Sequence, residues 1–124
     1  MANVGFWPTQ ARQKGIKQVT FKVTIGATGA CTLSTDGSSL GVASIVRDNT
    51  GLYSITLRDK YTALVGAHFT HLDDTLQNLS FQIKSEAVAT TKVIVLWTRV
   101  VATATDPTDT SIIYGSLLLK NSSV

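Results

Sequence analysis

Residues 42–57 read VASIVRDNTGLYSITL, a stretch with two apolar segments and a polar turn between them. In the second segment the apolar residues Tyr53 and Ile55 alternate with polar ones, the period-two pattern of a half-buried strand. Asn49 and Gly51 stand in the turn, where a tight hairpin needs residues that tolerate a positive φ. The stretch therefore predicts a β-hairpin.

Similar short segments recur on both sides of this hairpin, separated by turns rich in Gly, Ser, Thr and Asp. No segment keeps a period of 3.6 residues over three turns, so no substantial helix is expected. About eight short strands with turns between them are typical of an antiparallel sandwich or jelly roll, and the chain is expected to be all-β. The expected strands cover residues 19–25, 30–34, 42–47, 53–57, 63–72, 79–83, 93–101 and 112–119.

The composition agrees with this class of fold. The chain has 124 residues, 44% of them hydrophobic, which suits one domain with its own core. Only 15% of the residues are charged, whereas 18 are Thr and 11 are Ser. Thr suits a pleated, half-buried surface and Ser suits turns. We expect a single β domain over residues 19–124, preceded by an extended arm over residues 1–18.

The expected arm combines aromatic and basic residues and contains no acidic one. Phe6 and Trp7 are large apolar side chains, of a kind that a solvated segment does not need. They are therefore expected to pack against the surface of a partner. Arg12, Lys14 and Lys17 follow, in a chain of net charge +3. The arm is therefore predicted to bind a partner through these five residues. A solvated arm, aromatics docked on the domain's own core, and contact with nucleic acid are the alternatives.

The last two expected strands are apolar on both faces, unlike the others. Such strands need cover on both sides, which a loop, the arm or a second copy of the chain could provide, and a second copy is the simplest source. We therefore expect a homo-oligomer. The residues expected at its interface are Ile94, Leu96, Ile112, Tyr114 and Leu118.

Catalytic and metal-binding motifs are weak. The run Gly37–Gly41 matches the G-x-S-x-G pattern of serine hydrolases with Ser39 as the nucleophile, but that motif requires a strand-to-helix elbow that is not predicted here. His68 and His71 are three residues apart on an expected strand, so they should point to opposite faces and not share a metal ion. Cys31 is expected at a buried strand position. We predict no enzyme, no cofactor and no metal site.

Other partners are also disfavoured. No basic segment followed by an apolar run marks a signal peptide, and the longest apolar runs are too short to span a bilayer, so we expect synthesis in a cytoplasm and no membrane association. Specific binding of nucleic acid would need aromatic and basic residues interleaved on one exposed face. Tyr53, Phe69, Phe81 and Trp97 are instead expected in the core.

Part of the chain resembles a known group of proteins. The segments Gly41–Arg47 and Gly51–Leu57, followed by Lys60-Tyr61 and Leu64–Gly66, are similar to a run found in small structural proteins of tailed-phage virions, of the head decoration or cement type. The similarity covers roughly residues 41–72. It implies a β-fold that assembles on a capsid, often as a trimer, by means of terminal arms, and it transfers no functional residue.

The sequence thus leads to two functional hypotheses. The first is a non-enzymatic decoration protein that stabilises an assembled phage head in the virion, bound to the major capsid protein or another virion protein. The alternative is a tail-fibre or receptor-binding module that recognises glycans, in which exposed aromatics such as Trp7 or Tyr114 would stack on sugar.

Overall fold

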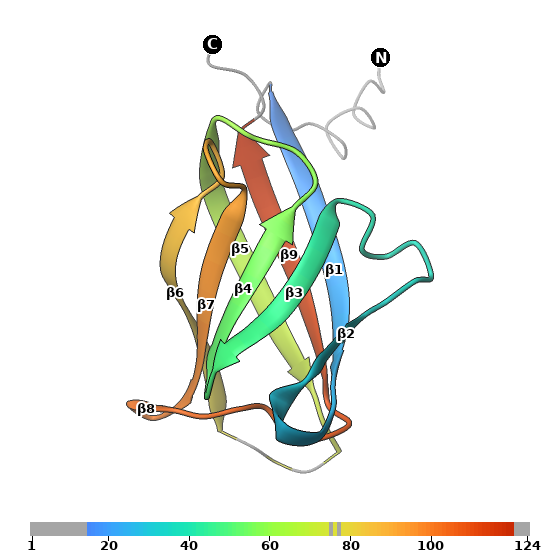
Figure 1. Ribbon diagram of the computed structural model, residues 1–124, viewed down its shortest axis with the longest axis vertical. Coiled ribbons are helices and arrows are strands. Elements are labelled where there is room, and N and C mark those ends of the chain that lie inside the picture. Colours follow the sequence, from blue (N-terminus) through green and yellow to red (C-terminus); the bar gives the residue numbers. More distant parts are fainter. Residues whose placement is uncertain (1–14, 75, 77, 121–124) are drawn as a thin grey trace, which may run out of the picture.

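The computed structural model describes residues 15–74, 76 and 78–120, and this part of the chain folds into two antiparallel sheets that pack face to face (Figure 1). Sheet A has the strand order β2-β1-β9-β5, and sheet B has the order β3-β4-β7-β6 with the short strand β8 paired to β7. The described residues include no helix long and apolar enough to cross a membrane. The prediction of an all-β antiparallel sandwich is confirmed. The elements are β1 (Ile16–Ile25), the 3-10 helix η2 (Ala27–Gly29), β2 (Cys31–Leu33), β3 (Val42–Asn49), β4 (Leu52–Leu57), β5 (Ala63–Leu72), β6 (Leu79–Ala87), β7 (Val93–Val100), β8 (Thr103–Ala104) and β9 (Ile112–Lys120).

The predicted hairpin forms between β3 and β4. Ile45 pairs with Ile55, and both side chains are buried. Gly51, in the turn before β4, has a φ of +65°, and a Cβ there would lie 2.6 Å from the backbone nitrogen of Thr105. Only glycine therefore fits the turn, both for its φ and for the close approach of the chain that follows β8.

The core lies between the sheets and follows from the alternation within the strands. In β1 the buried residues Val19, Phe21, Val23 and Ile25 alternate with more exposed polar ones. The ring of Phe21 occupies the space over Gly115 of β9, where a Cβ would overlap it. Sheet B contributes a matching layer to the core: Val42, Ile45, Ile55, Leu57, Ile94 and Leu96.

Lys17 was expected in the arm, which was predicted to end at residue 18, but it belongs to the domain. Strand β1 begins at Ile16, and Lys17 pairs with Leu119 of β9. The strand extends this far because β9 continues to Lys120 and provides a partner for each residue down to Ile16. The side chain of Lys17 is exposed, with its ammonium nitrogen 5.9 Å from the centre of the Tyr61 ring.

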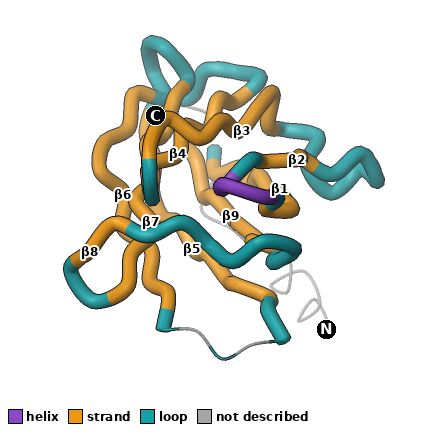
Figure 2. Tube along the Cα trace, turned by 60° about the horizontal axis from the view of Figure 1, so that its bottom comes forward, coloured by secondary structure: helices purple, strands orange, loops and turns teal. Residues whose placement is uncertain are grey.

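The segment between β8 and β9 crosses one end of the sandwich, from sheet B to sheet A (Figures 1 and 2). Asp106 of this segment binds Arg47, at the end of β3, through three contacts of 2.8–3.1 Å. Asp106 also accepts hydrogen bonds from the Gly51 amide at 2.8 Å and from the Tyr53 hydroxyl at 3.0 Å. This carboxylate fixes the crossing segment to the end of the hairpin.

Candidate interaction surface

Alternate residues of β9 point away from the core, and three of the residues predicted at an oligomer interface are among them. Ile112, Tyr114 and Leu118 lie on this outer face, while Ile113 and Leu117 between them are buried. Tyr114 is 39% exposed and Leu118 is 36% exposed. This arrangement follows from the alternation of side chains along a strand, in which residues two apart share a face.

The neighbouring edge strand β5 extends this apolar surface. Leu72 is directly opposite Ile112 and is 52% exposed. Val65 stands at an irregularity of the pairing between Leu64 and Gly66 and is 53% exposed. Leu72 and Val65 are absent from the predicted interface, because that prediction rests only on the two strands that are apolar on both faces. The outer apolar face of sheet A is defined by Val65, Leu72, Ile112, Tyr114 and Leu118.

Polar side chains fill the positions between these apolar ones. The Gln18 amide donates a hydrogen bond of 2.8 Å to the Ser116 hydroxyl across the β1–β9 pair. Lys22, directly opposite Tyr114, forms an ion pair of 3.9 Å with Asp36. The outward positions of β1, β5 and β9 within the described chain carry no carboxylate. The basic side chains at these positions are His68, Lys120 at the end of β9, and Lys22, which keeps Asp36 as its partner.

Two residues predicted at the interface lie elsewhere. Ile94 is 0% exposed and Leu96 is 3% exposed, and both point from β7 of sheet B into the core. Their assignment to an oligomer interface is wrong, because sheet A already covers them within a single chain. They also lie on a different sheet from Tyr114, so the five predicted residues do not form one surface.

Of the four aromatic residues that were expected in the core, three are there and one is not. Tyr53 is buried, and Phe69 and Phe81 pack against the core with their ring centres 5.7 Å apart, so these three predictions are confirmed. Trp97 is not in the core. Thr98 takes the inner position of β7 instead, with its hydroxyl bonded to the Thr105 carbonyl at 2.6 Å, and Trp97 lies half-buried on the outer face of sheet B.

The arm residues Phe6, Trp7, Arg12 and Lys14 lie outside the described residues. Their predicted contact with a partner stays a prediction. Lys17, the fifth residue of that set, belongs to β1.

The candidate nucleophile Ser39 has a structural role. Its side chain is buried, and its hydroxyl oxygen accepts a hydrogen bond of 2.9 Å from the Lys22 amide. This contact joins the Ser-rich loop before β3 to the edge of β1. The motif around Ser39 precedes a strand rather than a helix, so the elbow that a hydrolase requires is missing there.

The two histidines face opposite sides of sheet A, as the parity of the strand predicts. His68 pairs with Ser116 on the outer face, and His71 pairs with Ile113, which points into the core. Partial burial lowers the pKa of His71, against the opposing effect of Asp73. Among the described residues no three His, Cys, Asp or Glu side chains lie close enough to hold a metal ion together.

Cys31, at the start of β2, is half-buried. Its burial and the nearby Asp106 carboxylate raise the pKa of the thiol to about 11, against the opposing effect of Arg47. A thiol that stays protonated at neutral pH is a weak nucleophile.

Comparisons of the chain with protein-family models, with curated proteins and with solved structures find no match.

Proposed function

We propose that this chain is a non-enzymatic virion structural protein of the capsid decoration type, whose copies associate through the outer apolar face of sheet A. The observation that carries the association is the exposure of Val65, Leu72, Tyr114 and Leu118 on two adjacent strands of one sheet. Contiguous exposed apolar side chains on a small domain mark a surface that another protein covers. The virion context rests on the resemblance of residues 41–72 to phage decoration proteins.

A second copy of the chain is a suitable occupant of this face. The centre of the face has an aromatic residue and aliphatic ones with hydroxyl and amide groups between them, which is the composition of an interface core. Because Lys22 is paired with Asp36, packing three such faces around a threefold axis brings few unpaired like charges together. A trimer, the state that the resemblance implies, would place three arms on the same side of the assembly.

The arm supplies the contact with the capsid in this proposal. Phe6 and Trp7 act as apolar anchors on the major capsid protein or another virion protein, and Arg12 and Lys14 contact acidic groups around them. Buried aromatic residues are among those that contribute most of the binding free energy of an interface. Binding that bridges neighbouring capsid subunits stabilises the assembled head by mass action and needs no catalysis.

Co-sedimentation with capsids of the phage that encodes the chain tests this proposal. We expect saturable binding of the wild-type protein and binding at least about tenfold weaker for the double variant Phe6→Ala/Trp7→Ala, since buried aromatic anchors contribute 2 kcal/mol or more. Val46→Ala, an exposed site on sheet B, is the matched control and should bind like the wild type. Failure of the wild-type protein to sediment with capsids would contradict the proposal.

The second candidate, a receptor-binding module that recognises glycans, is favoured by one observation on the other sheet. Trp97 lies on the outer face of sheet B with polar side chains around it. This site lies away from the outer apolar face of sheet A, so the two functions are compatible in one molecule.

A further inference from the structure

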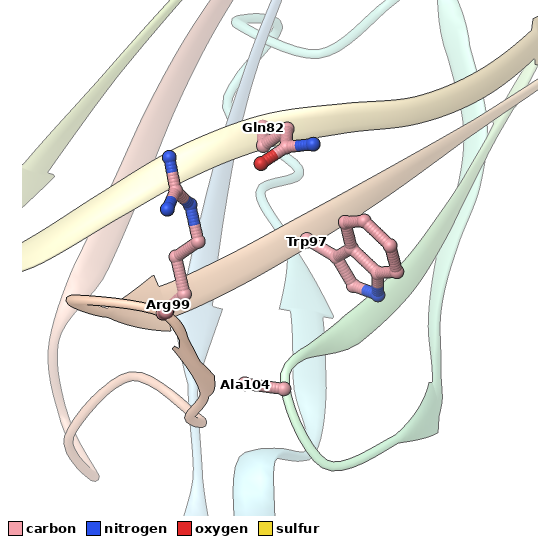
Figure 3. Close-up of a pocket in the computed structure, with 5 residues that line it drawn as sticks. Gln82, Trp97, Arg99 and Ala104 are labelled. Atoms are coloured by element: carbon pink, nitrogen blue, oxygen red, sulfur yellow. The ribbon is translucent and has the colours of Figure 1, made fainter.

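A hollow of about 330 Å³ lies on the outer face of sheet B, beside Trp97 (Figure 3). Trp97 and Arg99 extend from β7 on the same side, Gln82 comes from the neighbouring strand β6, and Ala104 comes from β8. The volume is at the lower end of the range for small-molecule sites and suits a ligand of about one ring. The short strand β8 bounds the hollow, because it pairs with β7 at Arg99.

The side chains around this hollow offer an aromatic surface and hydrogen-bond donors. The face of an indole is electron-rich and attracts the polarised C–H groups of a ligand ring. Gln82 is exposed and directly opposite Trp97, and its amide can both donate and accept. A sugar ring has an apolar face of C–H groups and polar hydroxyls around its edge. An aromatic surface with amide and guanidinium groups at the rim suits both.

Arg99 lines the hollow, and a second cation, Lys84, lies beside Trp97. The Lys84 ammonium lies 5.4 Å from the centre of the Trp97 ring. Arg99 donates one hydrogen bond to the Val101 carbonyl at 2.9 Å, while its Nε is buried without a hydrogen-bond partner. No carboxylate of the described residues pairs with either cation. A buried donor without a partner is rare in proteins, and a rotation of the Arg99 side chain toward the hollow would let a ligand carboxylate satisfy it.

We infer that this hollow binds an acidic saccharide, in which a sugar ring stacks on Trp97 and its carboxylate is held by Arg99 with the help of Lys84. A guanidinium is well suited to the carboxylate because its donors match the spacing of the two oxygens. Single-stranded nucleic acid could also use an aromatic residue and cations. It is disfavoured here because the site is one compact hollow with one aromatic residue, rather than an extended basic groove with several stacking positions.

The chain has two tryptophans, so the variant Trp7→Phe leaves Trp97 as the only indole reporter. In this variant, Trp97 fluorescence is titrated with glucuronic acid, galacturonic acid and N-acetylneuraminic acid, and with glucose and galactose as neutral counterparts. We expect a saturable change with at least one acidic sugar, and binding of its neutral counterpart at least about tenfold weaker because the charged hydrogen bonds are lost.

Two substitutions separate the contributions of stacking and charge. Arg99→Gln in the Trp7→Phe background should abolish the preference for the acidic sugar. Trp97→Ala in the full chain, followed by saturation-transfer NMR of the sugar, should weaken binding at least about tenfold. Val95→Ala, on the same outer face of β7, is the control and should leave binding unchanged. A thermal melt of each variant checks that it is folded.

The proposal is overturned if none of the acidic sugars gives a saturable change, or if acidic and neutral sugars bind equally. Tighter binding of an oligothymidylate than of any sugar would also overturn it and would assign the hollow to single-stranded nucleic acid. None of these results depends on the association of copies through sheet A or on binding to capsids.

Discussion

Arg47 and Asp106, which are 59 residues apart in the sequence, form a two-pronged ion pair at the end of the sandwich, with the Arg47 Nη2 and an Asp106 oxygen 2.8 Å apart. The same carboxylate accepts hydrogen bonds from the Gly51 amide and the Tyr53 hydroxyl. One side chain therefore joins the segment after β8 to the β3–β4 hairpin. Because that segment directly follows β8, whose Ala104 borders the Trp97 hollow, this ion pair supports a candidate binding site as well as the fold.

Replacement of Asp106 should destabilise the fold. Asp106→Asn removes the charge and an acceptor, and leaves the partly buried Arg47 and the buried Tyr53 hydroxyl without their full set of partners. We expect a loss of about 2–3 kcal/mol in the free energy of unfolding, measured by urea denaturation. Asp109→Asn, an exposed site in the same segment, is the control and should change stability by less than about 0.5 kcal/mol. Equal effects of the two substitutions would contradict this role of Asp106.

The stability of the protein should depend on pH through the ionisation of Asp106. Burial acts to raise the pKa of Asp106, but the hydrogen bonds from Arg47, the Gly51 amide and Tyr53 outweigh it and lower the pKa below the usual value. A depressed pKa in the folded state means that the stabilisation is present above the unfolded value of about 3.9 and is lost as the pH falls through the folded value.

Urea midpoints measured between neutral pH and acid should therefore decrease below about pH 4 in the wild-type protein, and less steeply in Asp106→Asn. A residual decrease is expected from Asp36, since hydrogen bonds from Ser34 and Ser38 also lower its pKa. Parallel acid profiles for the wild type and the variant would contradict the assignment.

Gly115 is required by the packing of Phe21. A Cβ at position 115 would overlap the aromatic ring, whereas a Cβ at Gly66, on the neighbouring strand, would have its nearest contact at 3.8 Å with Leu118. Gly115→Ala should cost about 2 kcal/mol or more through overpacking, and Gly66→Ala should cost less than about 0.5 kcal/mol. Phe21→Leu, made in the Gly115→Ala background, should recover part of the loss in a double-mutant cycle of thermal unfolding. Purely additive effects would show that the two residues do not interact.

The Cys31 thiol should react slowly in the folded protein. With a pKa of about 11, it is protonated at pH 8, and only roughly a thousandth of it is the reactive thiolate. Mass spectrometry after treatment with iodoacetamide should show little modification under native conditions and complete modification in urea. Equally fast labelling in both conditions would show that the thiol is neither buried nor raised in pKa.

The sequence predicted the strands well, because their patterns are local. The β3–β4 hairpin and the strand Ala63–Leu72 lie where alternation and turn residues place them. The start of β1 was misplaced because Ile16 to Gln18 are strand residues only by pairing with β9, a partner about 100 residues away.

The candidate surfaces were predicted less completely. Tyr114 and Leu118 were identified because an apolar residue at an outward position is unusual in a half-exposed strand. Ile94 and Leu96 were assigned to an interface because a strand pattern with two apolar faces does not say which face the other sheet covers. Trp97 was assigned to the core because its phase, shared with Val93 and Val95, was taken as the inward one, whereas the residues of β7 that point inward are Ile94, Leu96 and Thr98.

Light scattering coupled to size exclusion measures whether copies associate through the outer apolar face of sheet A. We expect the wild-type protein to have three times the 13.3 kDa mass of the chain. Tyr114→Lys/Leu118→Lys should have the mass of one folded chain, and Val46→Lys, 53% exposed on sheet B, should keep the wild-type mass. A wild-type protein with the mass of a single chain, or an oligomer that Tyr114→Lys/Leu118→Lys leaves intact, would show that this face does not join the copies.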